Sequence, residues 1–434
     1  MTETTIIAVK GRRVWDSRGR PTVEAEVVLE GGATGRAIAP AGASTGSGEA
    51  VDLRDGGAHQ GGRDVTRAVA HVSGEIAALL RGRDAAGQAA IDRALIDADG
   101  TANKGRLGGN ALVATSMAVA HAAAAAHGVP LWRYLAGGAP TRMPLPEIQI
   151  FGGGAHAAGR VDIQDFMVMC PRATSFAQAL DMTAEVYLVA GALLSERGLM
   201  QGVADEGGYW PAFRSNEEAL DMLVRAIERA GFTPGDEVAV SLDIAASAFG
   251  REGRYRLALE DRELNSDGLI ELLLGWIERY PIISIEDPVA EDDPNGFCRF
   301  TAAVGDRVQV IGDDFLVTNA ARVRAAAKDR SVNAVLLKPN QAGTLSETKA
   351  ALDAAREHGL AGIVSARSGE TEDVTIVHLA VGWDAGQLKV GSFARSERMA
   401  KWNEALRIEE ALGSSARFAG GAALGRCYPV QTGA

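Results

Sequence analysis

The chain has 434 residues, 47% of them hydrophobic and 23% charged, which allows two or three domains or one large barrel with an extra module. Its formal net charge of -12 argues against nonspecific binding to nucleic acid or to acidic lipid. Three scattered cysteines are too few for a disulfide framework or a metal cluster. Together with an N-terminus that lacks a signal-peptide pattern, they predict a cytoplasmic protein.

Residues 5 to 40 have the pattern of antiparallel strands. Short β-like runs cover Ile6 to Val9, Val23 to Leu29 and Thr34 to Ile38. Gly31-Gly32 predicts a hairpin turn between the last two runs.

The segment from Pro40 to Gly48 consists mostly of small residues. Its composition alone favours a flexible linker. The functional alternative is a mobile lid whose backbone and Ser44 hydroxyl approach an anionic ligand.

Residues 63 to 135 are predicted to be mostly helical. The apolar stretch from Ala111 to Ala126 is too short for a membrane span and is interpreted as a buried helix. A Gly- and Pro-containing segment, residues 136 to 140, predicts a domain boundary. We therefore expect an N-terminal α+β domain over residues 1–135 and a second domain over residues 143–434.

In the second domain, apolar strand-like runs alternate with helix-like segments at the spacing of βα units. The run from Ile282 to Ile285 is bounded by prolines and predicts a buried strand that ends at Glu286, although a solvated loop carboxylate is the alternative. Capping boxes at Ser215 and Thr344 predict helix starts. Successive units of this kind predict an α/β fold with a closed barrel of parallel strands.

All strand carboxyl ends of such a barrel lie at one face, so polar residues that follow the strands converge there. Six residues at or near these ends are Asp243, Glu286, Asp313, Lys338, Arg367 and Lys389.

Three carboxylates in one barrel mouth would raise one another's pKa unless a cation neutralised them. Ligation by oxygen alone, without His or Cys, suits Mg²⁺. The alternative is a network of ion pairs with Lys338 and Lys389. A lysine whose pKa is lowered by nearby cations can act as a base, and Mg²⁺ beside a substrate carboxylate stabilises the charge that forms when the adjacent carbon loses a proton.

Two further motifs are ambiguous by themselves. Asp205-Glu206 on a Gly-bounded turn could protonate a departing hydroxide or be a solvated acidic turn. His156 follows three glycines and could donate to an anionic oxygen, but a histidine in such a loop is more often a surface residue.

Nine motifs in unbroken order give the chain a resemblance to the enolase family over essentially its whole length. They are D-S-R-G-R-P-T-V-E from Asp16, G-A-S-T-G from Gly42, D-E-G-G from Asp205, S-L-D-I-A-A-S from Ser241, Y-P-I-I-S-I-E-D-P from Tyr280, G-D-D-F-L-V-T-N from Gly312, K-P-N-Q-A-G-T-L-S-E from Lys338, R-S-G-E-T-E-D from Arg367 and R-S-E-R-M-A-K from Arg395. A Lys base with Mg²⁺ is the arrangement described for the enolase superfamily.

The resemblance implies an enolase-type (β/α)8 barrel with an N-terminal capping domain, two Mg²⁺ ions and a homodimer or higher homo-oligomer. By position, Asp243, Glu286 and Asp313 match the ligands of the first Mg²⁺, and Ser44 matches the lid serine that helps to hold the second. Lys338 matches the base that removes the C2 proton, and Glu206 matches the acid that assists loss of the C3 hydroxyl. The implied substrate-binding residues are His156, Gln164, Asp165, Arg367, Ser368 and Lys389.

The chain departs from the family pattern near this implied site. Ala366 stands where the family has His, and Asp165 stands where it has Glu. Ala41, Gly152 and Ala248 also differ from the family pattern. Because the metal triad, base and acid are retained, we expect the proton-abstraction chemistry to persist with a reshaped, enlarged pocket around the phosphoryl group and C3.

These features predict a Mg²⁺-dependent lyase that forms an enolpyruvate from a 2-O-phosphoryl-type glycerate. The departures favour a specialised enzyme similar to carboxyphosphonoenolpyruvate synthase of phosphonate biosynthesis. The alternatives are an ordinary phosphopyruvate hydratase, which converts 2-phosphoglycerate to phosphoenolpyruvate, and a non-catalytic enolase-fold binding protein. The lid and phosphate motifs argue against an acid-sugar dehydratase or racemase.

Overall fold

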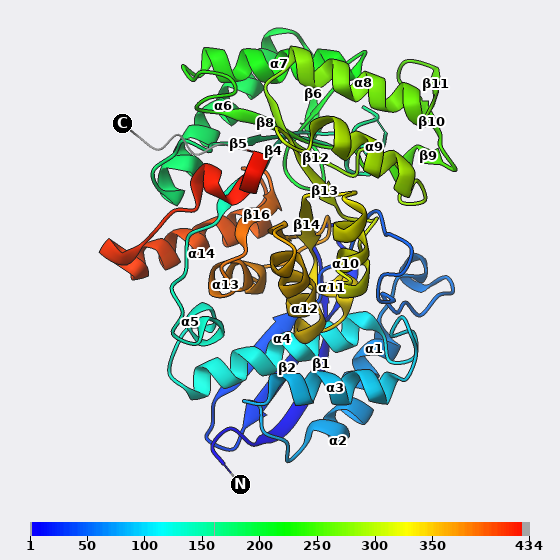
Figure 1. The fold of residues 1–434 in the computed structure, drawn as a ribbon. Helices are drawn as coiled ribbons and strands as arrows, with labels where there is room; N and C mark the ends of the chain where they lie inside the picture. Colours follow the sequence, from blue (N-terminus) through cyan, green and yellow to red (C-terminus); the bar gives the residue numbers. More distant parts are fainter. Residues whose placement is uncertain (1, 160, 428–434) are drawn as a thin grey trace.

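The computed structural model describes residues 2–159 and 161–427, and the end of the predicted second domain, after residue 427, lies outside the described residues. An N-terminal α+β part lies against one side of a β-barrel (Figure 1). The N-terminal sheet has the antiparallel order β1-β2-β3, formed by β1 (Ile6–Trp15), β2 (Pro21–Leu29) and β3 (Thr34–Ile38). The amide of Leu29 donates to Ala33 O at 2.9 Å, which closes the predicted hairpin around Gly31-Gly32.

One long helix covers this sheet. Gly35 on β3 leaves room for it, because a Cβ there would lie 2.2 Å from Ala118 O. The helix, α4 (Gly109–Ala126), is apolar and long enough to span a membrane by length and composition, and so is α6 (Phe176–Glu196). However, 83% of α4 and 56% of the α6 window are buried within the protein, so both are packed as core helices. The other helices of this part are the 3-10 helix η1 (His59–Gly62), α1 (Thr66–His71), the π-helix η2 (Val72–Ile76), α2 (Ala77–Leu80), α3 (Gln88–Asp99) and α5 (Leu131–Ala136).

The barrel is closed by pairing of its first and last strands, β4 and β16. Its eight strands are β4 (Leu145–Gly152), β5 (Asp165–Met169), β8 (Ala239–Asp243), β12 (Ile282–Glu286), β13 (Gln309–Gly312), β14 (Ala334–Leu337), β15 (Ala361–Ser365) and β16 (Gly386–Gly391). The predicted enolase-type barrel is confirmed. One strand differs from the expected parallel pattern: β5 is antiparallel to both β4 and β8, because a loop without an α-helix joins it to β4.

Helices surround the barrel, and two of them begin at the predicted caps. Ser215 accepts from the amide of Glu218, and Thr344 accepts from the amide of Glu347. The barrel helices after α6 are α7 (Asn216–Arg229), α8 (Ser266–Arg279), α9 (Pro294–Val304), α10 (Ala320–Asp329), α11 (Pro339–Ala342), α12 (Leu345–Glu357), α13 (Thr375–Gly382) and α14 (Ser396–Leu412).

Several short strands were not predicted. Strands β6 (Met200–Val203) and β7 (Tyr209–Pro211) extend the barrel sheet beside β4. A separate small sheet contains β9 (Gly250–Arg251), β10 (Arg254–Leu257) and β11 (Arg262–Asn265).

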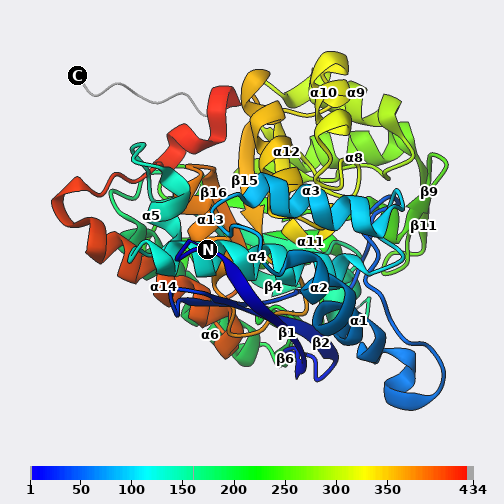
Figure 2. The ribbon, with the colours of Figure 1, turned by 90° about the horizontal axis from the view of Figure 1, so that it is seen from below.

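The N-terminal part and the barrel meet where α3 and α4 contact α11 and α12, and Figure 2 shows this contact from below. The segment of residues 40–48, here called the lid loop, is tied to the barrel. Ala41 and Gly369 exchange two backbone hydrogen bonds of 2.9 Å. The amide of Ser47 donates to Glu291 Oε2 at 2.8 Å, and Arg322 donates to Ser47 O at 2.9 Å. The expectation of a free linker is therefore wrong, because these contacts hold the loop over the barrel mouth.

Candidate active site

A small cavity at the carboxyl ends of the barrel strands gathers most of the predicted site residues. Its volume is about 20 Å³, and it is lined by Ser44, His156, Gln164, Asp165, Glu206, Asp243, Lys338, Ser365, Ala366, Arg367, Ser368 and Lys389. The two remaining predicted residues, Glu286 and Asp313, contact its lysines. The cavity has room for about one water molecule, so the expected enlargement of the pocket is not seen with the lid loop in this position.

Lys389 connects several acids across the barrel. Its Nζ lies 2.7 Å from Glu286 Oε2 and 3.0 Å from Asp243 Oδ2. Burial alone would lower the pKa of Lys389, but the carboxylates of Asp243 and Glu286 outweigh it and raise the pKa well above its ordinary value. Lys389 is therefore a fixed cation, suited to holding an anionic group.

Lys338 forms a close ion pair with Asp313 Oδ2, and Gln341 donates to the other Asp313 oxygen at 2.9 Å. Burial lowers the pKa of Lys338, and Asp313 outweighs that effect, so the net pKa is raised. A base must be neutral, so a cation that neutralised Asp313 would favour the form of Lys338 that can accept a proton.

The structure shows ion pairs where the sequence predicts a carboxylate triad. Among the described residues, the acid-containing groups whose ligand atoms lie within 4.8 Å of one another are His156/Asp165/Glu206 and Asp287/Asp313/Asp314. The predicted triad is not one of them.

The donor set nevertheless fits a divalent cation. Glu286 Oε1 and Gln164 Oε1 are buried without a hydrogen-bond partner. Burial, followed by the charge of Asp243, raises the pKa of Glu286 well above its ordinary value. Buried acceptor oxygens without a partner, beside several carboxyl groups, are what an oxygen-preferring ion such as Mg²⁺ would satisfy.

Asp287, which follows the middle acid of the predicted triad, was not predicted to have a role. Its backbone has a positive φ of 41°, uncommon for a residue other than glycine. Its carboxylate accepts from the amides of Asp313 at 2.9 Å and Asp314 at 2.8 Å. Asp287 thus orients the turn that carries Asp313.

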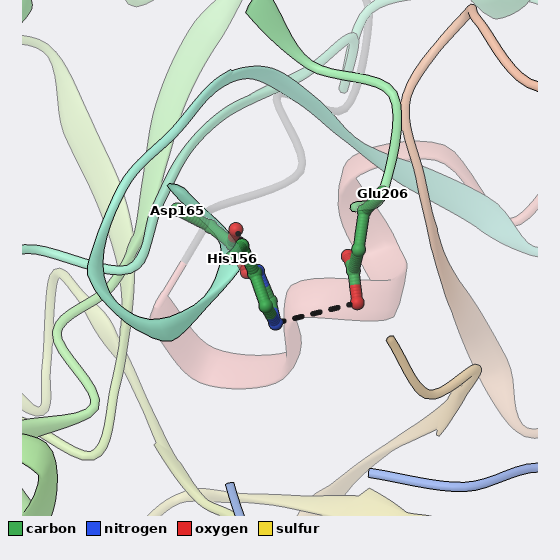
Figure 3. Close-up of side chains that lie close together, drawn as sticks. All are labelled: His156, Asp165 and Glu206. Atoms are coloured by element: carbon green, nitrogen blue, oxygen red, sulfur yellow. Dashed lines mark hydrogen bonds and ion pairs between the residues drawn. The ribbon is translucent and has the colours of Figure 1, made fainter. Parts of the chain in front are cut away.

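On the other side of the cavity, a histidine links two acids (Figure 3). His156 Nδ1 donates to Asp165 Oδ1 at 3.0 Å, and His156 Nε2 lies 3.7 Å from Glu206 Oε1. Burial acts to lower the pKa of His156, but Asp165 and Glu206 raise it to about 9. His156 also lies 3.0 Å from Ser368 Oγ, so it is a buried site residue and not a surface one.

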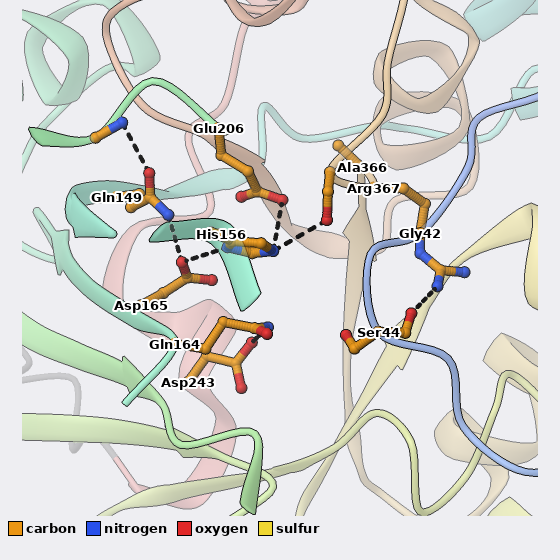
Figure 4. A network of polar contacts seen from close by, with 12 residues as sticks. Gly42, Ser44, Gln149, His156, Gln164, Asp165, Glu206, Asp243, Ala366 and Arg367 are labelled. Carbon is orange, nitrogen blue, oxygen red and sulfur yellow. Dashed lines mark hydrogen bonds and ion pairs between the residues drawn. The ribbon is translucent and has the colours of Figure 1, made fainter. Parts of the chain in front are cut away.

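Arg367, the predicted phosphate-binding arginine, binds to the lid loop and to the residue that follows it. Arg367 donates to Ser44 O at 2.9 Å (Figure 4) and to Glu49 Oε2 at 3.0 Å. Gly42 permits this approach, because a Cβ there would overlap the guanidinium at 1.9 Å. Glu49 was not identified from the sequence as a site residue. Its position close to the G-A-S-T-G motif was the signal that could have indicated it.

Comparison with known proteins agrees with this arrangement. Residues 6–135 match the family model "Enolase, N-terminal domain", and residues 140–426 match "Enolase, C-terminal TIM barrel domain". The chain is 50% identical to "Enolase 1" of Desulfitobacterium hafniense over 95% of each chain. It is also 50% identical to "Enolase" of Rubrobacter xylanophilus, over 96% of this chain and 97% of the relative. With matching models across both parts and near-full-length relatives, this chain belongs to the enolase family and is a carbon–oxygen hydro-lyase.

Proposed function

We propose that this hydro-lyase converts 2-phosphoglycerate to phosphoenolpyruvate in a Mg²⁺-dependent reaction. The observation that carries the proposal is that Lys338 and Glu206, the matched base and acid, line one buried cavity together with Lys389 and Arg367. The two relatives named as enolases favour this ordinary reaction over the specialised one that the sequence departures favour. Because all four of these charged residues are retained in one cavity, a non-catalytic binding protein is disfavoured.

Each residue has a chemical part in the proposed reaction. Neutral Lys338 takes the proton from C2, and the electron pair of that C–H bond is first delocalised into the substrate carboxylate. The same pair then forms the C2=C3 double bond when the C3–O bond breaks. Protonated Glu206 gives its proton to the departing hydroxide, which leaves as water. Lys389 holds the substrate carboxylate, and Arg367 with Ser368 binds the phosphoryl group.

Asp243, Glu286 and Asp313 are the residues that would hold the first Mg²⁺, with Ser44 for a second ion. Bound Mg²⁺ would supply electrostatic stabilisation of the charge that develops on the substrate carboxylate. The side chains of Gln164 and His156 complete the polar lining of the cavity.

A second candidate is a substrate with a bulkier carboxyphosphono group. The supporting observation is that Ala366 and the shortened acid Asp165 both line the cavity, so two positions of its lining are smaller than in the family pattern. Ala366 can make room for added bulk only after the lid loop opens.

The test is the appearance of the enolpyruvate absorbance from 2-phosphoglycerate with Mg²⁺, run beside a carboxyphosphono analogue and a Lys338→Ala control. Turnover typical of enolases on 2-phosphoglycerate supports the proposal. Turnover of the analogue alone would establish the second candidate. If neither substrate reacts and Mg²⁺ does not bind, the chain is a non-catalytic member of the family.

We also propose a cytoplasmic homodimer or higher homo-oligomer. The three cysteines are free, and three large apolar side chains are exposed, with Ile7 at 38%, Trp15 at 49% and Leu188 at 64%. Light scattering of the purified protein measures the mass of the assembly, and a monomer at micromolar concentration would contradict this part of the proposal.

A further inference from the structure

Gln149 lies between two parts of the site and has no role in the reaction described above. It is on β4, and its side chain points into the barrel with 1% exposure. Its Nε2 donates to Asp165 Oδ1 in a short hydrogen bond, and its Oε1 accepts from the amide of Gly208 at 2.8 Å. Figure 4 shows Gln149 beside Asp165, with His156 and Glu206 beyond.

The two hydrogen-bond partners of Gln149, Asp165 and the amide of Gly208, both help to position Glu206, the proposed catalytic acid. Asp165 fixes His156, which faces Glu206 at 3.7 Å. Gly208 closes the turn that carries Glu206, because the amide of Ala204 donates to Gly208 O at 2.7 Å. Gln149, Asp165, His156 and the backbone from Glu206 to Gly208 therefore form a closed ring of contacts.

Two glycines allow the backbone to pack closely against the amide group of Gln149. A Cβ on Gly208 would lie 2.3 Å from Gln149 Oε1, and a Cβ on Gly152 would lie 3.4 Å from Gln149 Nε2. Because the side chain is buried, an apolar replacement would leave the Gly208 amide and one Asp165 bond without their partner. The loop that carries Glu206 would then lose this side-chain attachment to β4 and keep only the backbone pairing of Tyr209 with Phe151.

We propose that Gln149 is a positioning residue that holds Glu206 and His156 in place for loss of the C3 hydroxyl, and that it has no part in removal of the C2 proton. This inference rests on the proposed function. The base, Lys338, is on the other side of the cavity and is paired with Asp313, with no contact to Gln149 among the described residues. The two halves of the reaction are therefore expected to respond differently to a change at Gln149.

The first experiment uses Gln149→Met, which keeps the size of the side chain and removes both hydrogen bonds. In D₂O with 2-phosphoglycerate and Mg²⁺, NMR follows exchange of the C2 hydrogen and formation of the enolpyruvate separately. We expect dehydration to fall about 100-fold, as for displaced catalytic groups, while C2 exchange falls by less than about tenfold. The matched control is Gln309→Met, the same change at a buried glutamine that accepts from Ser284 Oγ, and it should leave the ratio of the two rates unchanged.

The second experiment needs no substrate. Hydrogen–deuterium exchange of the peptide that covers residues 204–208 should become faster in Gln149→Met, since the Gly208 amide loses its acceptor. Gln149→Glu keeps that acceptor but replaces the amide donor to Asp165 with a second carboxyl group, so its peptide should exchange as in the wild type while its dehydration rate falls.

Equal loss of both rates in Gln149→Met, or unchanged deuterium exchange, would overturn the positioning role. Absence of turnover in the wild type would instead overturn the proposed substrate, and the deuterium exchange result alone would then decide whether Gln149 holds the Glu206 loop.

Discussion

Arg367 and Glu49 form a buried ion pair between the barrel mouth and the residue that follows the lid loop, with Arg367 Nη1 3.0 Å from Glu49 Oε2. Their side chains are 3% and 8% exposed, so solvent screens the pair only weakly. The guanidinium proposed for the phosphoryl group is thus already neutralised by the protein's own carboxylate. An incoming phosphoryl group must share Arg367 with Glu49 or displace it.

Replacing Glu49 by Gln is expected to strengthen the binding of inorganic phosphate about tenfold, because a competing negative charge beside Arg367 is removed. Isothermal titration calorimetry of the wild type and the variant measures the difference. Glu30→Gln, an exposed substitution in the same part of the chain, is the control. Unchanged or weaker phosphate binding in Glu49→Gln would show that Glu49 orders Arg367 for binding instead of opposing it.

Lys338→Ala should lower kcat on 2-phosphoglycerate by about 10²- to 10⁴-fold, which is the usual contribution of a general base. KM should change much less, since the carboxylate and phosphoryl groups of the substrate are assigned to Lys389 and Arg367. Steady-state kinetics gives both constants. The exposed Lys328→Ala serves as control, and a variant of Lys338 that keeps full kcat would remove it from the role of base.

Mg²⁺ is expected to raise the Tm of the wild type by a few degrees, because binding to the folded state alone adds about 2.7 kcal/mol at a hundredfold excess over Kd. Glu286→Gln should lose most of this shift, since it removes one carboxylate charge from the site. Differential scanning fluorimetry with and without EDTA measures the effect. The surface change Glu278→Gln should keep the full shift, and an equal shift in both variants would place the ion elsewhere.

Because His378 on α13 is buried, we expect the folded state to lose stability in acid. Burial, followed by repulsion from His121, lowers its pKa to about 4, whereas the unfolded chain has a value of about 6.5. The lower pKa in the folded state means that the stabilisation is present above pH 6.5 and is lost as the pH falls towards 4. The loss is at most about 3 kcal/mol, because Glu404 lies 3.6 Å from His378 Nε2 and favours the charged form.

Urea unfolding at pH 7 and at pH 4.5 tests this expectation. The decrease in unfolding free energy between the two should be smaller in His378→Leu than in the wild type. An equal decrease in the two proteins would assign the acid sensitivity to other groups. His358→Leu, at an exposed site, is the control.

The sequence by itself determined the barrel and the identity of its polar mouth. Apolar runs that end at Asp243, Glu286 and Lys338 could be located because a buried strand needs continuous apolar residues, and a change to polar residues marks its end. The hairpin at Gly31-Gly32 and the helix cap at Thr344 could also be predicted, because each depends only on residues within a few positions in the sequence.

Only the tertiary structure decided which of these polar groups face one another. The reversal of β5, the docking of the lid loop, the pairing of Arg367 with Glu49 and the contacts of Gln149 all join residues far apart in the chain. Such contacts follow from barrel register and from the packing of the N-terminal part against the barrel. Neither residue spacing nor composition encodes these distances, because a one-residue change of register would send the same side chains to the opposite face of a strand.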